Sequence, residues 1–396
     1  MKRVILLASF LLIFVGILLG RITFVEAEPK DQPSIQLLTD AKSGILMEFE
    51  TGEVLFEYNA HEKRSPASMT KIMSILLITE AIVNGKLKWD DIITVSENAA
   101  SYGGSQIFLA ENETMSVEDL YKGMVIASGN DATVALAEAV AGSEEHFVQL
   151  MNERAKELGL QNTAFKDPNG LTELEDGHYS TAYDMAVLSR HLLKQYGDIV
   201  LKYSSIYEDY LRKGTDREFW LVNTNKLVRH VPGVDGLKTG WTRKSGYNLT
   251  ATMKKDGMRL ISVVMGNSKP TARNADTMRL FNYGFSMYQV NEFLRAGQVV
   301  DTLDSIYLRP RRVEVITKEA VHFVTKKGQP LGDYTTTFTY RLPKGKVNSG
   351  DVIGKLTVLD RGKVVAEVEL TVNETVQPVG LLKLLGRTMK RTLLGE

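Results

Sequence analysis

Three short groups of polar residues have the types and spacing needed for acyl transfer. In the first, Ser68-Met69-Thr70-Lys71, Ser68 and Lys71 are three positions apart, so they share one face of a helix. A serine hydroxyl needs a base to become a good nucleophile, and lysine is one only when burial or nearby positive charge lowers its pKa. The apolar residues around this segment would supply that burial. Alone the pattern is weak, because a chain of this length contains about one S-x-x-K by chance, and a capped core helix with an exposed lysine explains it equally well.

The second group is Ser128-Gly129-Asn130, in a short loop between two predicted helices. The serine hydroxyl is suited to relaying a proton, and the asparagine amide to holding a substrate carbonyl or the lysine. A capping turn between helices explains this S-x-N pattern about as well, and residues 96–98 carry a second copy of it.

The third group is Lys238-Thr239-Gly240, next to a strand-like stretch. Lysine and threonine can bind a carboxylate, while glycine lets a substrate lie against the strand. The alternative is a strand edge at the surface that the lysine protects from pairing. Each group is ambiguous alone, but the three occur in the order S-x-x-K, S-x-N, K-T-G, which is specific.

This ordered set resembles the motifs of penicillin-binding proteins and class A β-lactamases. From about Ala41 to its C-terminus, the chain resembles a low-molecular-mass penicillin-binding protein, a serine-type D-alanyl-D-alanine carboxypeptidase of the peptidase S11 kind. In detail it resembles the sporulation-type members of spore-forming Gram-positive bacteria. The stretches that carry the resemblance are 66–73, 104–109, 127–132, 167–171, 178–184 and 233–242.

The resemblance implies a mechanism at the matching positions. Ser68 attacks the carbonyl between the two terminal D-alanines of a peptidoglycan stem pentapeptide, and Lys71 takes its proton. Ser128, with Lys238, passes a proton to the leaving amine. The backbone N–H groups of Ser68 and of the residue after Gly240 form the oxyanion hole. Water then hydrolyses the acyl-enzyme, which limits cross-linking of the wall, and β-lactams acylate Ser68 because they mimic the D-Ala-D-Ala end.

The resemblance also assigns substrate contacts. Asn130 orients the acyl chain, and Thr239 binds the terminal carboxylate together with a downstream arginine. Arg273 lies at a fitting distance from the K-T-G group, but Arg279 is nearby and stays open as the alternative. No metal or organic cofactor is implied. We interpret His178 as structural, because a general base is already present and a lone histidine is usually not catalytic.

Composition excludes several other classes of protein. The chain has no cysteine, so it has no thiolate nucleophile and no zinc–thiolate site. Its 48 basic and 48 acidic side chains argue against a nucleic-acid partner, which usually meets a basic excess.

Three other functions remain open. A β-lactamase shares the acylation residues but needs a dedicated deacylating carboxylate, and no motif places one here. A non-enzymatic β-lactam or peptidoglycan sensor needs only acylation. A transpeptidase differs only in the acceptor.

The pattern of apolar residues predicts the elements that position these groups. Strands at 43–50 and 53–59 flank a turn, and a buried helix runs to about 83, with Ser65 at its N-cap and Pro66 at its first position. An α/β (α+β) domain over residues 41–296 follows, with a mixed or antiparallel sheet flanked by helices. The resemblance makes it a β-lactamase/transpeptidase-like domain. The further helices are expected at 117–127, 131–141, 145–158, 181–195 and 272–288, and two further strands at 248–253 and 258–265.

Both ends of the chain differ from this domain. Residues 1–27 have a basic start, an apolar run and small residues before a cleavage point, which predicts a signal peptide; the alternative is a retained membrane anchor. The mature chain would carry 45 basic and 47 acidic groups and would work outside the cytoplasm. Residues 28–40 are interpreted as a linker.

After residue 296 short β-rich runs predict a small all-β domain over 297–376. The pattern of residues 377–396 predicts a basic amphipathic helix, with Leu381, Leu385 and Met389 on one face and Lys383 and Arg387 on the other. Such a helix suits an anionic membrane surface, which would place the protein at the outer face of the cytoplasmic membrane in the cell-wall space. The alternative is a helix docked on the protein's own core.

Overall fold

The computed structural model describes residues 36–340 and 345–394. The predicted signal peptide over residues 1–27 and most of the linker over 28–40 lie outside these ranges.

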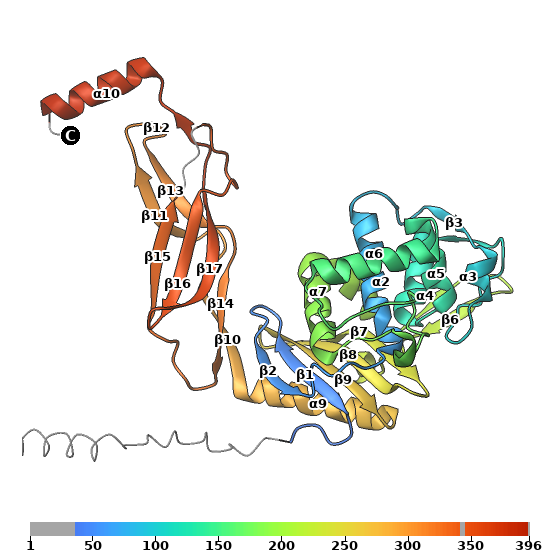
Figure 1. Ribbon diagram of the computed structural model, residues 1–396. Helices are drawn as coiled ribbons and strands as arrows, with labels where there is room; N and C mark the ends of the chain where they lie inside the picture. Colours follow the sequence, from blue (N-terminus) through green and yellow to red (C-terminus); the bar gives the residue numbers. More distant parts are fainter. Residues whose placement is uncertain (1–35, 341–344, 395–396) are drawn as a thin grey trace, which may run out of the picture. The chain divides into compact units, whose positions relative to one another are not determined.

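A five-stranded antiparallel sheet in the order β2-β1-β9-β8-β7 is the centre of the N-terminal domain in the described part of the chain (Figure 1). The predicted sheet therefore takes its antiparallel form rather than the mixed one. The first two strands form the expected hairpin, and Gly52 in its turn adopts a φ of +79°, which glycine adopts without strain. The strands are β1 (Ser43–Glu48), β2 (Val54–Tyr58), β7 (Val234–Thr242), β8 (Gly246–Lys255) and β9 (Met258–Asn267).

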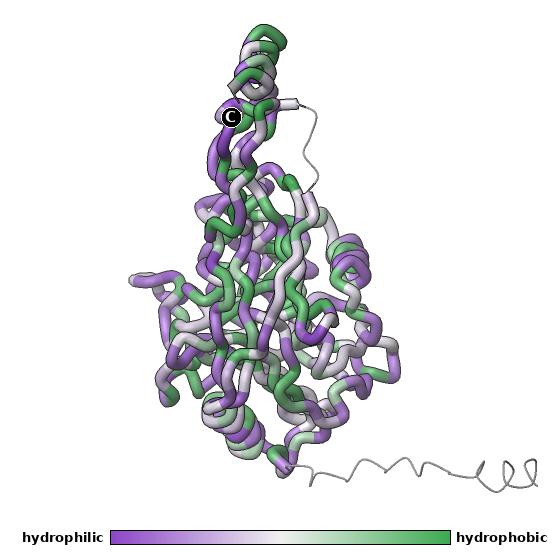
Figure 2. Tube along the Cα trace, turned by 90° about the vertical axis from the view of Figure 1, so that its left-hand side faces the viewer, coloured by the Kyte–Doolittle hydropathy of each residue, from purple (hydrophilic) through white to green (hydrophobic). Residues whose placement is uncertain are grey.

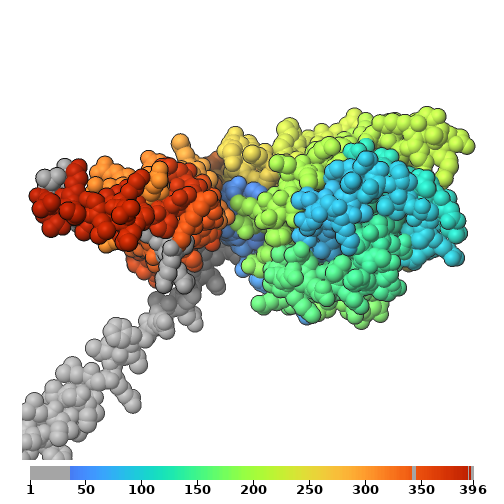
Figure 3. All heavy atoms as spheres, turned by 90° about the horizontal axis from the view of Figure 1, so that it is seen from above, coloured from blue at the N-terminus to red at the C-terminus, as the bar shows by residue number. Residues whose placement is uncertain are grey.

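Helices cover both faces of this sheet (Figure 1). Figure 3 shows the N-terminal domain from above as spheres, with the residues of the larger helical layer coloured from blue to green. The larger core lies between the sheet and a helical layer built around α2, whose residues are almost all buried. A smaller core lies between the other face and α9 (Pro270–Met287). The helices of the large layer are α2 (Lys71–Val83), α3 (Glu97–Ser101), α4 (Val117–Ile126), α5 (Asn130–Ala141), α6 (Glu144–Glu157) and α7 (Ala182–Ser204).

Short elements complete the domain. The two-stranded sheets β3–β4 and β5–β6 and the one-turn helix α8 were not predicted, because they are too short to show a clear period. Helix α7 continues to Ser204, past its predicted end at 195, through a kink at Tyr196. The short elements are β3 (Ile92–Thr94), β4 (Thr114–Ser116), β5 (Glu208–Leu211), β6 (Phe219–Val222), α8 (Leu227–His230) and the 3-10 turn η2 (Leu174–Asp176).

The predicted N-terminal cap of the buried helix is wrong. Pro66 precedes a 3-10 turn, η1 (Ala67–Thr70), and no side chain caps it. Ala67 has a φ of +48°, so the backbone leaves the helical path between Pro66 and the next turn. Helix α2 begins only at Lys71. Ser65 therefore cannot be the N-cap of α2.

A β-rich C-terminal domain follows, as predicted. Its five-stranded sheet has the order β11-β13-β17-β16-β15. The buried apolar residues of this domain form a core of their own. Strand β10 begins at Tyr288 and pairs with β14, before the predicted start at 297. The strands are β10 (Tyr288–Leu294), β11 (Val299–Asp304), β12 (Leu308–Arg309), β13 (Arg312–Thr317), β14 (Val321–Lys326), β15 (Tyr334–Tyr340), β16 (Gly354–Asp360), β17 (Lys363–Val372) and β18 (Gln377–Pro378).

The terminal helix α10 (Leu381–Leu394) is amphipathic, and Figure 2 shows hydrophobic and hydrophilic residues along it. Most of its described apolar side chains are exposed, with Leu382 at 86% and Leu385 at 53%, so they do not pack on a core of the protein. Arg387 donates hydrogen bonds to the carbonyls of Ile306 and Leu308, which fixes the helix to the β12 region. Within the described ranges, none of the helices has both the length and the apolar character to cross a bilayer.

Candidate active site

Ser68 and Lys71 meet where η1 turns into α2. The Lys71 Nζ atom donates to Ser68 Oγ at 3.3 Å. Ser68 is half-buried and accessible, whereas Lys71 is fully buried. Burial lowers the pKa of Lys71 to about 7, against the opposing charges of Asp167 and Asp131. A lysine with this pKa can act as a base near neutral pH.

Two further oxygen atoms hold the Lys71 amine. Its Nζ atom lies 2.7 Å from Asn130 Oδ1 and 3.2 Å from the Asn169 carbonyl oxygen. A neutral amine has two N–H bonds and one lone pair. When these oxygens accept the two N–H bonds, the lone pair is left for the hydroxyl proton of Ser68. This arrangement can deprotonate the serine.

The S-x-N loop lies beside this pair. Ser128 has a φ of +64°, a strained value for serine, and its buried Oγ atom has no hydrogen-bond partner among the described residues. Asn130 is held by a hydrogen bond from its Nδ2 atom to the Gly103 carbonyl. The second S-x-N copy is a helix cap instead, because Ser96 Oγ accepts the N–H of Ala99 at the start of α3.

The K-T-G group lies on β7, an edge strand of the central sheet. Lys238 is buried, and burial, followed by the positive charges of Lys71 and Arg273, places its pKa well below the ordinary value. A Cβ atom at Gly240 would lie 2.4 Å from the Pro66 carbonyl oxygen and 3.2 Å from the Ser68 nitrogen. Only glycine lets β7 approach the nucleophile turn this closely.

The remaining predicted residues are Thr239 and the two candidate arginines, of which only one lies near Lys238. Thr239 Oγ1 donates to Thr224 Oγ1 at 2.7 Å. Arg273 is buried, and burial lowers its pKa to about 10, while its charge acts on Lys238. Arg279 instead donates to the buried carboxylate of Asp276 at 2.6 Å. The structure therefore brings Arg273, and not Arg279, to the group around Lys238.

Sequence reasoning missed three residues at this site. Asn169 contacts Lys71, and Thr224 contacts Thr239. The Asp131 carboxylate accepts N–H groups from the 107–109 segment, which it holds beside the S-x-N loop. Only the resemblance of stretches 127–132 and 167–171 gave any signal for two of them, and it assigned them no role.

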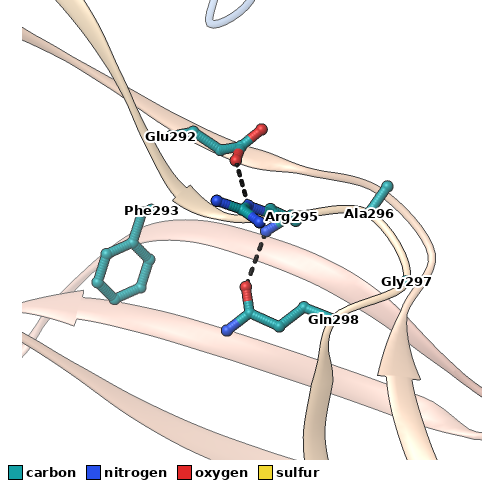
Figure 4. A pocket seen from close by; sticks show the side chains of 6 residues that line it. All are labelled: Glu292, Phe293, Arg295, Ala296, Gly297 and Gln298. Carbon is teal, nitrogen blue, oxygen red and sulfur yellow. Dashed lines mark hydrogen bonds and ion pairs between the residues drawn. The ribbon is translucent and has the colours of Figure 1, made fainter.

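A hollow in the turn between β10 and β11 is a separate feature (Figure 4). Arg295 bonds there to Glu292 and to Gln298, as the figure shows. The residues that line it are Glu292, Phe293, Arg295, Ala296, Gly297 and Gln298. None of these side chains is a hydroxyl or a lysine, so the hollow has no acyl-transfer chemistry.

Comparison with known proteins agrees with this geometry. Residues 28–269 match the family model for D-alanyl-D-alanine carboxypeptidase, and residues 288–378 match that for the penicillin-binding protein 5 C-terminal domain. The chain belongs to the D-alanyl-D-alanine carboxypeptidase family. This confirms the predicted family.

This carboxypeptidase is 44% identical to D-alanyl-D-alanine carboxypeptidase DacF of Bacillus subtilis (strain 168), over 98% of each chain. It is similar in structure to penicillin binding protein 5 from Haemophilus influenzae, with a TM-score of 0.70 and 31% identity over 85% of this chain and 98% of that one. Penicillin-Binding Protein D2 from Listeria monocytogenes, solved in its cefotaxime-bound form, matches with a TM-score of 0.56 and 33% identity over 62% of this chain and 97% of that one. The predicted fold class is confirmed as well.

Proposed function

We propose that this D-alanyl-D-alanine carboxypeptidase removes the terminal D-alanine of peptidoglycan stem pentapeptides through an acyl-enzyme on Ser68. The observation that supports the proposal best is the buried Lys71, whose Nζ atom lies 3.3 Å from Ser68 Oγ and whose pKa is about 7. Ser68 Oγ attacks the carbonyl carbon while Lys71 takes the hydroxyl proton. The C–N bond then breaks, and the leaving amine of D-alanine receives a proton through Ser128, with Lys238 beside it.

The substrate binds along the edge of β7. The backbone N–H groups of Ser68 and Trp241 stabilise the oxyanion, and losing one such donor typically costs about 3 kcal/mol of barrier. Thr239 and Arg273 bind the terminal carboxylate, because a hydroxyl and a guanidinium are suited to it. Asn130 orients the acyl chain. Water then hydrolyses the ester and releases Ser68.

An assay on a synthetic pentapeptide tests this function. Release of D-alanine, with water as the main acceptor even when an amine is added, is the expected result. A product dominated by the added amine would indicate a transpeptidase instead. Penicillin should acylate the enzyme and be released slowly. Fast penicillin hydrolysis would favour a β-lactamase, and acylation without any D-alanine release would favour a sensor.

We also propose the chain's organisation and location. Residues 1–27 are a signal peptide, 28–40 a linker, 41–296 the catalytic domain, 297–376 the β-rich domain and 377–396 a membrane-associating helix. The enzyme then works at the outer face of the cytoplasmic membrane. The exposed apolar side chains of α10 support this placement. The resemblance to sporulation-type relatives supports a role in spore formation, and unchanged spore peptidoglycan in a deletion strain would argue against it.

Removing the terminal helix is expected to release the signal-cleaved enzyme from membranes. In the full-length protein, the exposed apolar face of α10 and basic residues such as Lys383 bind anionic vesicles. The chain that lacks residues 381–396 should stay in the supernatant after vesicle sedimentation, while turnover of a soluble pentapeptide stays close to that of the full chain.

A double substitution offers a control without shortening the chain. Leu382→Glu with Leu385→Glu places charge on the exposed apolar face and should weaken vesicle binding as well. Thr388→Ala changes the same helix without adding charge and should leave binding unchanged. Sedimentation of the truncated chain with vesicles would contradict membrane attachment through α10.

A further inference from the structure

His178 is fully buried beside the nucleophile turn and has a partner on each ring nitrogen. Its Nδ1 atom accepts the N–H of Lys166 at 3.1 Å, and its Nε2 atom lies 2.8 Å from Thr70 Oγ1. Because Nδ1 is an acceptor, the neutral ring carries its proton on Nε2 and donates it to Thr70. Burial lowers the pKa of His178, although the carboxylate of Asp167, 3.6 Å from Nδ1, opposes this shift.

The loop that precedes His178, residues 166–172, is tightly organised. The Asp167 carboxylate accepts backbone N–H groups from four residues: Asn169, Gly170, Leu171 and Thr172. Gly170 has a φ of +81°, and a Cβ atom there would lie 1.9 Å from the Ala67 carbonyl oxygen. The loop therefore packs its backbone directly on η1.

Loop 166–172 and His178 together contact three positions of the segment 70–74. Ser74 Oγ donates to the Pro168 carbonyl at 2.7 Å, and Lys71 Nζ donates to the Asn169 carbonyl at 3.2 Å. The third contact is made by His178 on Thr70, the residue directly before the general base. The position of the Asn169 carbonyl, which accepts the hydrogen bond from Lys71, therefore depends on loop 166–172. His178 connects this loop to the segment that contains Lys71.

We propose that His178 is a positioning residue for acylation, because it fixes loop 166–172 against Thr70 and so holds the Asn169 carbonyl on Lys71. This inference rests on the proposed function. His178 makes no hydrogen bond to Ser68 or Lys71 within the described structure, so it acts through the loop and not on the reacting atoms. The interpretation of His178 as structural thus becomes more specific: its structural role is to position the loop that holds Lys71.

Two substitutions separate the two ring nitrogens. In His178→Gln the amide nitrogen reaches the place of Nε2 and keeps the bond to Thr70. In His178→Asn the amide oxygen reaches the place of Nδ1 and keeps the bond from Lys166, but nothing reaches Thr70. Each variant breaks one end of the link between Lys166 and Thr70, so the rate of acylation by fluorescent penicillin should fall about 10- to 100-fold in both, as for a misplaced catalytic group.

The pH profile supplies a readout that a loss of stability alone would not move. When the Asn169 carbonyl leaves Lys71, the ammonium form loses a hydrogen bond and the pKa of Lys71 falls. The rising limb of acylation against pH should therefore move to lower pH in His178→Asn. Thermal unfolding identifies the folded fraction, and His146→Asn, on the exposed face of α6, is the matched control with an unchanged profile.

Thr70→Val tests the same contact from the other side. It should give the same loss and the same shifted limb, and the double variant with His178→Asn should lose little more than either single one. Three results would overturn the proposal. They are a native acylation rate in folded His178→Asn, a rising limb of its pH profile that does not move, and rate losses that multiply in the double variant. If His178→Asn does not fold, the limb of Thr70→Val decides alone. Absence of labelling in the native enzyme would instead count against the proposed function.

Discussion

Replacing Ser68 by alanine is expected to abolish both D-alanine release and covalent labelling by fluorescent penicillin. The Oγ atom forms the bond to the substrate carbonyl, and no other hydroxyl within the described structure lies in hydrogen-bond contact with Lys71. Loss of a nucleophilic serine typically costs more than about 10⁴-fold in rate. Labelled protein on a denaturing gel and released D-alanine from a pentapeptide measure the two effects separately.

Ser65→Ala is a matched control for this variant. Ser65 is another buried serine in the same segment, and its Oγ atom has no hydrogen-bond partner among the described residues. This change should leave labelling intact. Unchanged labelling of Ser68→Ala would refute Ser68 as the nucleophile.

Lys71→Gln is expected to slow acylation by about 10²- to 10⁴-fold, the usual contribution of a general base. Burial lowers the pKa of Lys71 to about 7, so in the native enzyme the active neutral form increases as pH rises. Acylation should therefore increase tenfold per pH unit below about 7 and level off above it. Lys71→Gln should lose this limb, and stopped-flow acylation between pH 5 and 9 measures both effects.

Lys71→Arg separates the base from the charge. Arginine keeps a positive charge but does not give up its proton in this pH range, so this variant should be as slow as Lys71→Gln. An active Lys71→Arg enzyme would show that the cation, rather than the base, assists Ser68. Lys86→Gln, at an exposed position after α2, should behave as the native enzyme.

Much of the fold was predictable because it depends on local patterns. The apolar run from Ile72 to Leu77 predicts a buried helix, and the Thr51-Gly52 turn between two apolar runs predicts a pair of joined strands, as the structure has them. The short β-rich runs after residue 297 predicted the C-terminal strands for the same reason. The cap at Ser65 failed because Ala67 adopts a left-handed backbone in the turn that β7 packs against, and no local pattern reports that contact.

The sequence by itself determined the chemical groups: a serine, a lysine three residues on, an S-x-N loop and a K-T-G strand. Only the tertiary structure makes Lys71 suited to act as a base, because its pKa depends on complete burial and on carboxylates from a distant loop, Asp167, and from helix α5, Asp131. It also separates Arg273 from Arg279, since the fold places Arg273 near Lys238 and Arg279 on the carboxylate of Asp276. Motifs specify which chemical groups are present, whereas burial and long-range contacts set their protonation state and the groups that they contact.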